Sequence, residues 1–186
     1  MSHDAVCGRH WGLLYTEFAE FQLALCDVHG APVAAGFTIP VVWSGRRRDL
    51  PSGLDGVLEQ GVRDRARRRR PTTLSALLAV VSPQHRDEGL SREVVSGMKT
   101  IAERHELREL IAPVRPTLKH RYPLDPWLRT HWRLGATLLR LAPRSMVVTG
   151  TVAAWEAWTE MRFPESGASS SRTSGCATPS LRRERD

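Results

Sequence analysis

The stretch Leu74–Arg104 reads LSALLAVV-SPQHRDEG-LSREVVSGMKTIAER. Its first block is an apolar run about one strand long, and its second block is polar and ends in a glycine. In the third block, Leu90, Val94, Val95, Met98, Ile101 and Ala102 recur at helical spacing. The stretch therefore predicts a buried strand, a turn and an amphipathic helix in succession.

A strand that runs through a turn into a helix can bind phosphate groups. The first N–H groups of a helix have no partner within the helix, and the helix dipole places partial positive charge there. Here those groups belong to Asp87, Glu88, Gly89, Leu90 and Ser91, and Arg86 could add a charge-assisted bond. The alternative is an ordinary strand-to-helix turn, since Arg-x-x-Gly is a common pattern.

The elements after this stretch indicate an α/β fold. Arg108–Val114 is predicted to be a second buried strand, so the strand–helix–strand unit should place two parallel strands side by side through a right-handed crossover. The chain has no Gly-x-Gly-x-x-Gly, which argues against a dinucleotide-binding unit. The remaining predictions are strands at Phe21–Val28, Pro32–Trp43, Ala136–Leu141 and Ser145–Thr149, and helices at Leu54–Ala66, Trp127–Leu134 and Thr151–Met161.

Several finer expectations accompany this outline. Pro40 suggests a sheet edge or a distortion, and Trp155 and Trp158 are expected on the inward side of the last helix. Residues 1–163 are predicted to form one domain. Residues 164–186 are rich in Ser, Gly and Arg, and are predicted to be a disordered tail.

Composition limits the classes of function. The net charge is +7, and arginine runs occur at 46–48 and 67–70. These runs fit either a solvated helix end, where basic residues match the dipole, or a nucleic-acid patch, although no aromatic residues interleave with them. Cys7, Cys26 and Cys176 show no metal-ligand spacing, and we expect reduced thiols in a cytoplasmic protein. No run approaches 18 apolar residues, so no membrane span is predicted.

Arg86–Ser91 resembles the coenzyme A loop of GNAT-type N-acetyltransferases, Arg/Gln-x-x-Gly-x-Gly/Ala, with Ser91 in the last position. The order of the predicted elements is similar to most of that fold. From His10 to Gly167 the chain also resembles uncharacterised GNAT-like proteins of actinobacteria. The strings that carry this likeness are Phe18–Gln22, Arg69–Leu77, Leu110–Thr117 and Ala142–Val152.

The resemblance implies a mixed central sheet flanked by helices and a bacterial, acyl-CoA-dependent N-acyltransferase, with acetyl-CoA as the expected donor and an unidentified amine as acceptor. It places the diphosphate at Arg86–Ser91 and the pantetheine arm beside Ala79, Val80 and Val81. It also matches Tyr122 to the family tyrosine that protonates the departing thiolate; the alternative is a packing residue with a hydrated hydroxyl group.

The chain departs from the family at its opening, before Asp125 and after Gly167, where the likeness stops although relatives return to ordered structure. The opening strand and two helices are mostly absent, and a loop that relatives carry before Asp125 is missing. A fragment, a degenerate copy and a divergent enzyme all fit these departures.

The general base is not assigned. His120, Asp125 and His131 are candidates, while His85 and Glu88 belong to the predicted phosphate loop, where Glu88 would present its backbone rather than its carboxylate. The alternative function is a non-catalytic basic interaction module that binds nucleic acid. The acceptor and the oligomeric state are not predicted.

Overall fold

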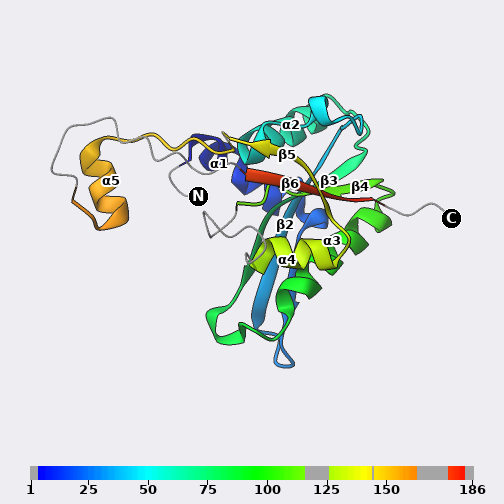
Figure 1. Ribbon diagram of the computed structural model, residues 1–186, viewed down its shortest axis with the longest axis horizontal. Coiled ribbons are helices and arrows are strands. Elements are labelled where there is room, and N and C mark those ends of the chain that lie inside the picture. Colours follow the sequence, from blue (N-terminus) through cyan, green and yellow to red (C-terminus); the bar gives the residue numbers. More distant parts are fainter. Residues whose placement is uncertain (1–3, 116–125, 144, 163–175, 183–186) are drawn as a thin grey trace.

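A mixed sheet forms the centre of the computed structural model (Figure 1), which describes residues 4–115, 126–143, 145–162 and 176–182. The six strands of the described residues lie in the order β1-β2-β3-β4-β6-β5. All neighbouring pairs are antiparallel except β3 and β4, which are parallel. The strands are β1 Leu23–Cys26, β2 Pro32–Val41, β3 Thr73–Val81, β4 Glu109–Ile111, β5 Thr137–Ala142 and β6 Cys176–Arg182.

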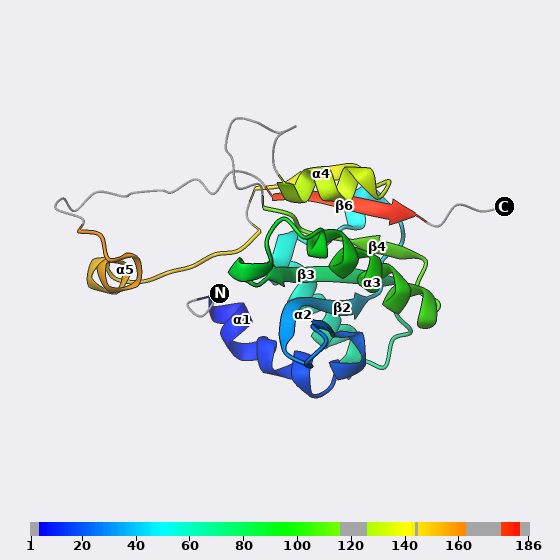
Figure 2. The same cartoon turned by 90° about the horizontal axis from the view of Figure 1, so that it is seen from below.

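Helices cover both faces of this sheet (Figure 2). On β2, Gly36 faces Met98 of α3, whereas Ile39 contacts Gly61 of α2, so residues of opposite parity meet opposite helical layers. The helix α4 packs beside α3, and α1 packs beside α2. The helices are α1 Ala5–His10, α2 Gly53–Ala66, α3 Leu90–Arg104, α4 Pro126–Arg133 and α5 Val152–Thr159. None of them is long and apolar enough to cross a membrane, within the described residues.

The predicted strand–helix–strand unit is confirmed. The strand β3 leads through a short 3-10 turn, Pro83–His85, into α3, and β4 then returns parallel to β3. The helix buries the apolar face that its spacing predicted: Val94, Val95, Met98, Ile101 and Ala102. These side chains join Leu74 and Leu77 of β3 in the main core.

The hairpin before this unit is also confirmed, with shifted bounds. Phe21 lies in a 3-10 turn, Ala19–Phe21, rather than in β1. At the hairpin turn, Gly30 has φ +84° and the Asp27 carboxylate accepts the N–H groups of His29 and Ala31 at 2.8 and 2.9 Å. Pro40 pairs with Leu74 of β3 but lies beyond the part of β2 that pairs with β1, so it stands at a local edge as expected.

The end of the chain differs from the prediction of a disordered tail over 164–186. Cys176–Arg182 forms β6 and lies between β4 and β5, pairing with both. Composition misled here because backbone pairing on both edges can hold a polar strand in place. The other residues of the predicted tail lie outside the described residues.

Two further predictions fail after β5. Ser145–Thr149 is not a strand; its one bridge joins Val148 to Asp4, and β6 takes its expected place beside β5. The last helix forms as α5, with the Thr151 hydroxyl accepting the Ala154 N–H at 3.1 Å. However, α5 stands away from the sheet in both views (Figures 1 and 2), so Trp155 and Trp158 do not face the sheet. Their rings meet edge to face, with 5.4 Å between centroids.

Candidate functional site

The parallel strands β3 and β4 pair over a short distance and then separate. Their register runs from Thr73 and Glu109 to Ser75 and Ile111, where β4 ends. The strand β3 continues to Val81, paired with β2 along its other edge. Its edge from residue 76 to 81 therefore carries no neighbouring strand among the described residues. Backbone groups along such an edge can pair with an extended ligand.

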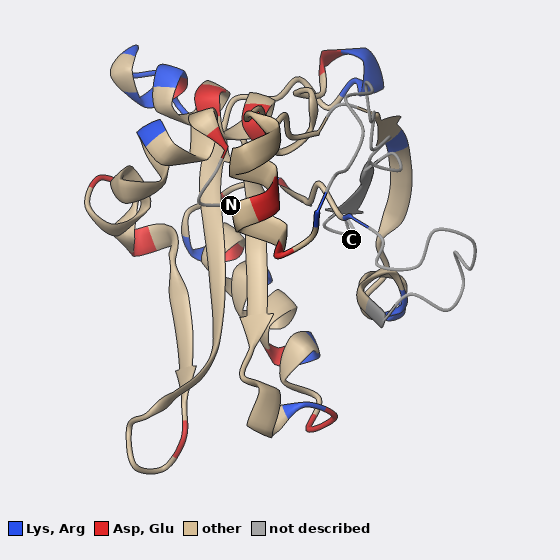
Figure 3. Cartoon of the chain, turned by 90° about the vertical axis from the view of Figure 1, so that its left-hand side faces the viewer, with Lys and Arg blue, Asp and Glu red and all other residues tan. Residues whose placement is uncertain are grey.

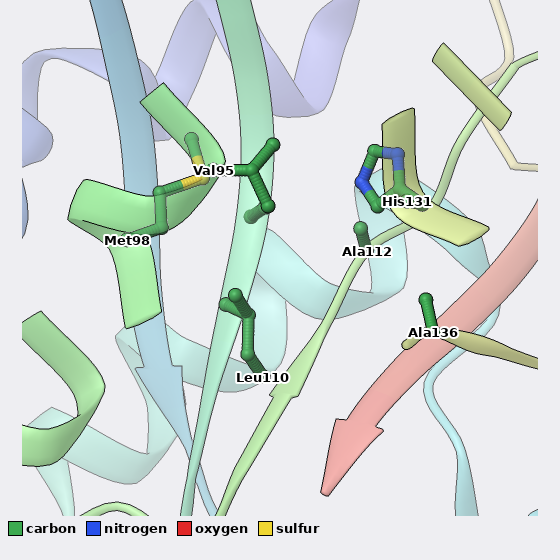
Figure 4. Close-up of a pocket in the computed structure, with 7 residues that line it drawn as sticks. Val95, Met98, Leu110, Ala112, His131 and Ala136 are labelled. Carbon is green, nitrogen blue, oxygen red and sulfur yellow. The ribbon is translucent and has the colours of Figure 1, made fainter. Parts of the chain in front are cut away.

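A small cavity lies inside this separation, between β3, β4, α3 and α4 (Figure 4). Its volume is about 10 Å³, close to the space that one water molecule needs. Apart from one polar residue, the lining is apolar: Ala76, Val95, Met98, Leu110, Ala112 and Ala136. The cavity is thus the closed inner end of the separation, and a ligand as large as a CoA thioester would have to lie along the β3 edge outside it.

The polar residue of the cavity is His131. It is 8% exposed and points from α4 toward Ala112 and Val95 (Figure 4). Its Nδ1 lies 2.7 Å from the Trp127 carbonyl oxygen, and the carbonyl can only accept. The hydrogen bond therefore places a proton on Nδ1 and fixes the ring orientation.

The predicted phosphate loop follows β3 directly. Gly89 has φ +80°, a left-handed conformation that glycine adopts readily, and it caps α3 without any side-chain hydrogen bond. Asp87 also has positive φ, +66°. A Cβ atom built on Gly89 would meet no atom within 4 Å, so the space beside this residue is open.

The backbone donors of this loop are available. Within the described chain, no protein hydrogen bond uses the N–H groups of residues 87–91. Arg86 is exposed beside them. The Glu88 carboxylate lies 3.1 Å from Nδ1 of His85, which keeps this acidic group engaged on the loop's own side chains.

The predicted site residues divide into two groups. Ala79–Val81 and Arg86–Ser91 lie together at one end of β3 and α3, and His131 lies at the inner end of the same separation. Tyr122, His120 and Asp125 lie outside the described residues. Sequence reasoning named His131 only as one of several histidines, because its burial depends on how α4 packs.

Three arginines of the two runs pair with acidic side chains. Arg69 donates to the buried carboxylate of Asp64 at 2.9 Å, and Arg70 pairs with Glu106 at 3.1 Å. Arg48 lies 3.6 Å from Asp49. In Figure 3, basic segments gather at two places near the top of the view, and acidic segments lie close to both. This arrangement favours solvated element ends over a nucleic-acid surface.

Comparisons with known proteins agree with this geometry. No protein-family model matches the chain. It is 30% identical over 188 residues to the arginine N-acetyltransferase avaD of Aspergillus versicolor, a match that covers 84% of this chain and 64% of that protein's length.

Two solved structures share the fold. The GphF GNAT-like decarboxylase in complex with isobutyryl-CoA superposes with a TM-score of 0.63 at 13% identity, over 91% of this chain and 82% of that one. The loading GNATL domain of CurA from Lyngbya majuscula superposes with a TM-score of 0.57 at 14% identity, over 91% and 80%. With its mixed sheet flanked by helices and its separated parallel strands, the chain has the GNAT-like fold.

Proposed function

We propose that the protein is an acyl-CoA-dependent N-acyltransferase that moves an acetyl group from acetyl-CoA to an amine. One observation carries the proposal: the unpaired edge of β3 leads directly into a loop whose N–H groups are uncovered. In acetyl-CoA an extended pantetheine arm is joined to a diphosphate, in the same order as the β3 edge and the loop. The similarity to an arginine N-acetyltransferase supports the same activity, and a structure with the same fold was solved in complex with isobutyryl-CoA.

The diphosphate would accept bonds from the N–H groups of Asp87 to Ser91, with Arg86 adding a charge-assisted bond. The pantetheine amides would pair with Ala79–Val81 as an added strand. This places the thioester near the point where β3 and β4 separate. Holding the thioester and the amine together can lower the barrier by roughly 7–11 kcal/mol at best.

The chemical step needs a neutral amine and a protonated leaving group. An alkylamine with a pKa of about 10.4 must lose its proton before it attacks the thioester carbonyl. The tetrahedral intermediate then expels the CoA thiolate, and we assign its protonation to the Tyr122 phenol. Arginine is the first acceptor to test, because the relative avaD acts on it.

Calorimetry with acetyl-CoA tests the proposal on the full chain. We expect binding, and we expect Arg86→Glu to weaken it by ~10–100-fold, because a charge-assisted bond of about 1.5–3 kcal/mol becomes a repulsion. Arg104→Glu, an exposed charge reversal at the far end of α3, is the matched control and should bind normally.

Two results would contradict the proposal. One is no binding of acetyl-CoA at millimolar concentration by protein shown to be folded. The other is equal affinity in the Arg86→Glu and Arg104→Glu variants. Release of CoA in the presence of arginine or other amines, followed by chromatography, then tests the transfer itself.

A further inference from the structure

Three metal-binding side chains meet on the opposite side of the fold from α3. Asp4 caps α1, Cys7 lies in its first turn, and Asp55 lies in the first turn of α2. One ligand atom from each residue lies within 4.8 Å of the other two. Asp4 and Cys7 are each 2% exposed and Asp55 is partly buried, so this cluster is not a surface group of acids.

Each carboxylate of the cluster uses one oxygen and leaves the other without a partner. Asp4 Oδ1 accepts the Cys7 N–H at 2.7 Å, and Asp55 Oδ2 accepts the Val147 N–H at 3.0 Å. Asp4 Oδ2 and Asp55 Oδ1 are the only buried side-chain oxygen or nitrogen atoms of the described residues that lack a hydrogen-bond partner. Both orphaned atoms thus belong to the same cluster.

No basic side chain compensates these two acids in the described part of the chain, since none of its salt bridges involves Asp4 or Asp55. Buried carboxylates are normally paired, hydrogen-bonded or bound to a metal, because an unpaired buried charge is costly. A thiol beside them adds a soft ligand.

We propose that Asp4, Cys7 and Asp55 form a binding site for one divalent transition-metal ion of the zinc class. A thiolate together with two carboxylates is a ligand set that suits Zn²⁺, whereas Ca²⁺ and Mg²⁺ prefer oxygen ligands alone. Tetrahedral ligands at Zn–S of about 2.3 Å and Zn–O of about 2.0–2.2 Å lie roughly 3.3–3.8 Å apart. Small side-chain rotations would bring the three atoms to that spacing, and water would be the fourth ligand.

The ion would join three separate segments of the chain. Asp4 forms an isolated β-bridge with Val148. The Asp55 carboxylate accepts the Val147 N–H, and the Asp55 N–H donates to the Ser145 carbonyl at 3.0 Å. A bound metal would tie α1, the start of α2 and residues 145–148 together. Its role is structural and independent of acyl transfer.

The test uses tag-free full-length protein treated with EDTA and then dialysed. Titration with ZnCl₂ against a chromophoric chelator should show one equivalent bound, and Co²⁺ should produce a sulfur-to-cobalt charge-transfer band. Cys7→Ser should abolish the band and weaken Zn²⁺ binding at least tenfold. Cys26→Ser, at an exposed cysteine, is the matched control and should keep both.

Asp55→Asn provides a second variant if Cys7→Ser does not fold, with circular dichroism as the check of folding. It should weaken Zn²⁺ binding at least tenfold while the cobalt–sulfur band weakens or shifts. Absence of a bound equivalent in the wild-type protein overturns the proposal. Equal Zn²⁺ affinity in wild-type, Cys7→Ser and Asp55→Asn protein overturns it as well.

Discussion

Ser75 of β3 and Ile111 of β4 are the last two residues that pair the parallel strands. Beyond them β4 ends, whereas β3 runs on to Val81 and into the turn before α3. Because β4 ends there, β3 has an unpaired edge, and this edge leads to the start of α3. The proposed donor site follows from this single break in pairing.

Gly89 should matter for acyl-CoA binding beyond its effect on stability. Gly89→Ala forces a side chain into φ +80° and should destabilise the fold by roughly 1–2 kcal/mol. Its methyl group would also occupy the open space beside the loop that we assign to the diphosphate, so we expect weaker acetyl-CoA binding by calorimetry. Gly30→Ala is the matched control, because Gly30 has φ +84° and equally empty surroundings at the hairpin turn. Equal affinity in the two variants would argue against the loop.

Gly36 and Gly97 should respond in opposite directions to the same substitution. A Cβ on Gly36 would lie 2.7 Å from Met98 Cε and 3.0 Å from Val94 Cγ1, so Gly36→Ala should cost roughly 1–3 kcal/mol through overpacking. Gly97 lies inside α3, where a Cβ would make ordinary contacts of 3.4 Å or more. Gly97→Ala should therefore stabilise the protein by roughly 0.5–1 kcal/mol. Urea unfolding measures both, and a stabilising Gly36→Ala would contradict the close packing of α3 on β2.

Asp55 should make stability fall as the pH rises. Burial raises the pKa of its carboxyl group from 3.8 to about 6, with Asp4 and Glu59 adding to the rise and the Val147 N–H opposing it. Because the carboxyl pKa is higher in the folded than in the unfolded state, protonation of Asp55 stabilises the fold. This stabilisation is fully present below pH 3.8 and is lost as the pH rises through about 6. In EDTA, Asp55→Asn should exceed the wild-type stability by ~1–3 kcal/mol at neutral pH. Urea unfolding at several pH values should show the difference shrinking toward pH 4.

Asp64 should be far more sensitive to substitution than its ion-pair partner. Its side chain is 4% exposed, accepts the Val42 N–H at 2.8 Å and pairs with Arg69 at 2.9 Å. Asp64→Ala leaves the Val42 N–H unsatisfied, which should cost about 1–3 kcal/mol, and removes an ion pair worth up to about 1 kcal/mol. Arg69→Ala should cost only about 1 kcal/mol because Arg69 is half exposed, although the substitution leaves Asp64 without its cation. Similar losses in the two variants would show that the ion pair dominates over the backbone contact.

The sequence was most informative where hydrophobic periodicity is strong. The apolar run of β3 and the helical spacing of Val94 and Met98 predicted the strand–helix–strand unit, and with it the loop at Gly89. The place of β6 could not be predicted, because strand pairing is decided by partners distant in the chain rather than by its own composition.

Clusters of residues that are distant in the chain could not be predicted from the sequence for a related reason. Asp55 meets Asp4 and Cys7 only because α1 packs on α2, and no spacing in the sequence records that contact. The burial of His131 likewise depends on where α4 lies. By contrast, the role of Tyr122 remains a prediction from the family resemblance.

The position of β6 has a consequence for how the protein is made. Because Cys176–Arg182 lies between β4 and β5, the β5 strand has no neighbour in the sheet until those residues arrive. Until Cys176–Arg182 is free of the ribosome, β1 to β4 can assemble while β5 has no partner. A chain that lacks residues 176–182 should therefore expose unpaired strand edges to chaperones, and the full chain should bind chaperones less.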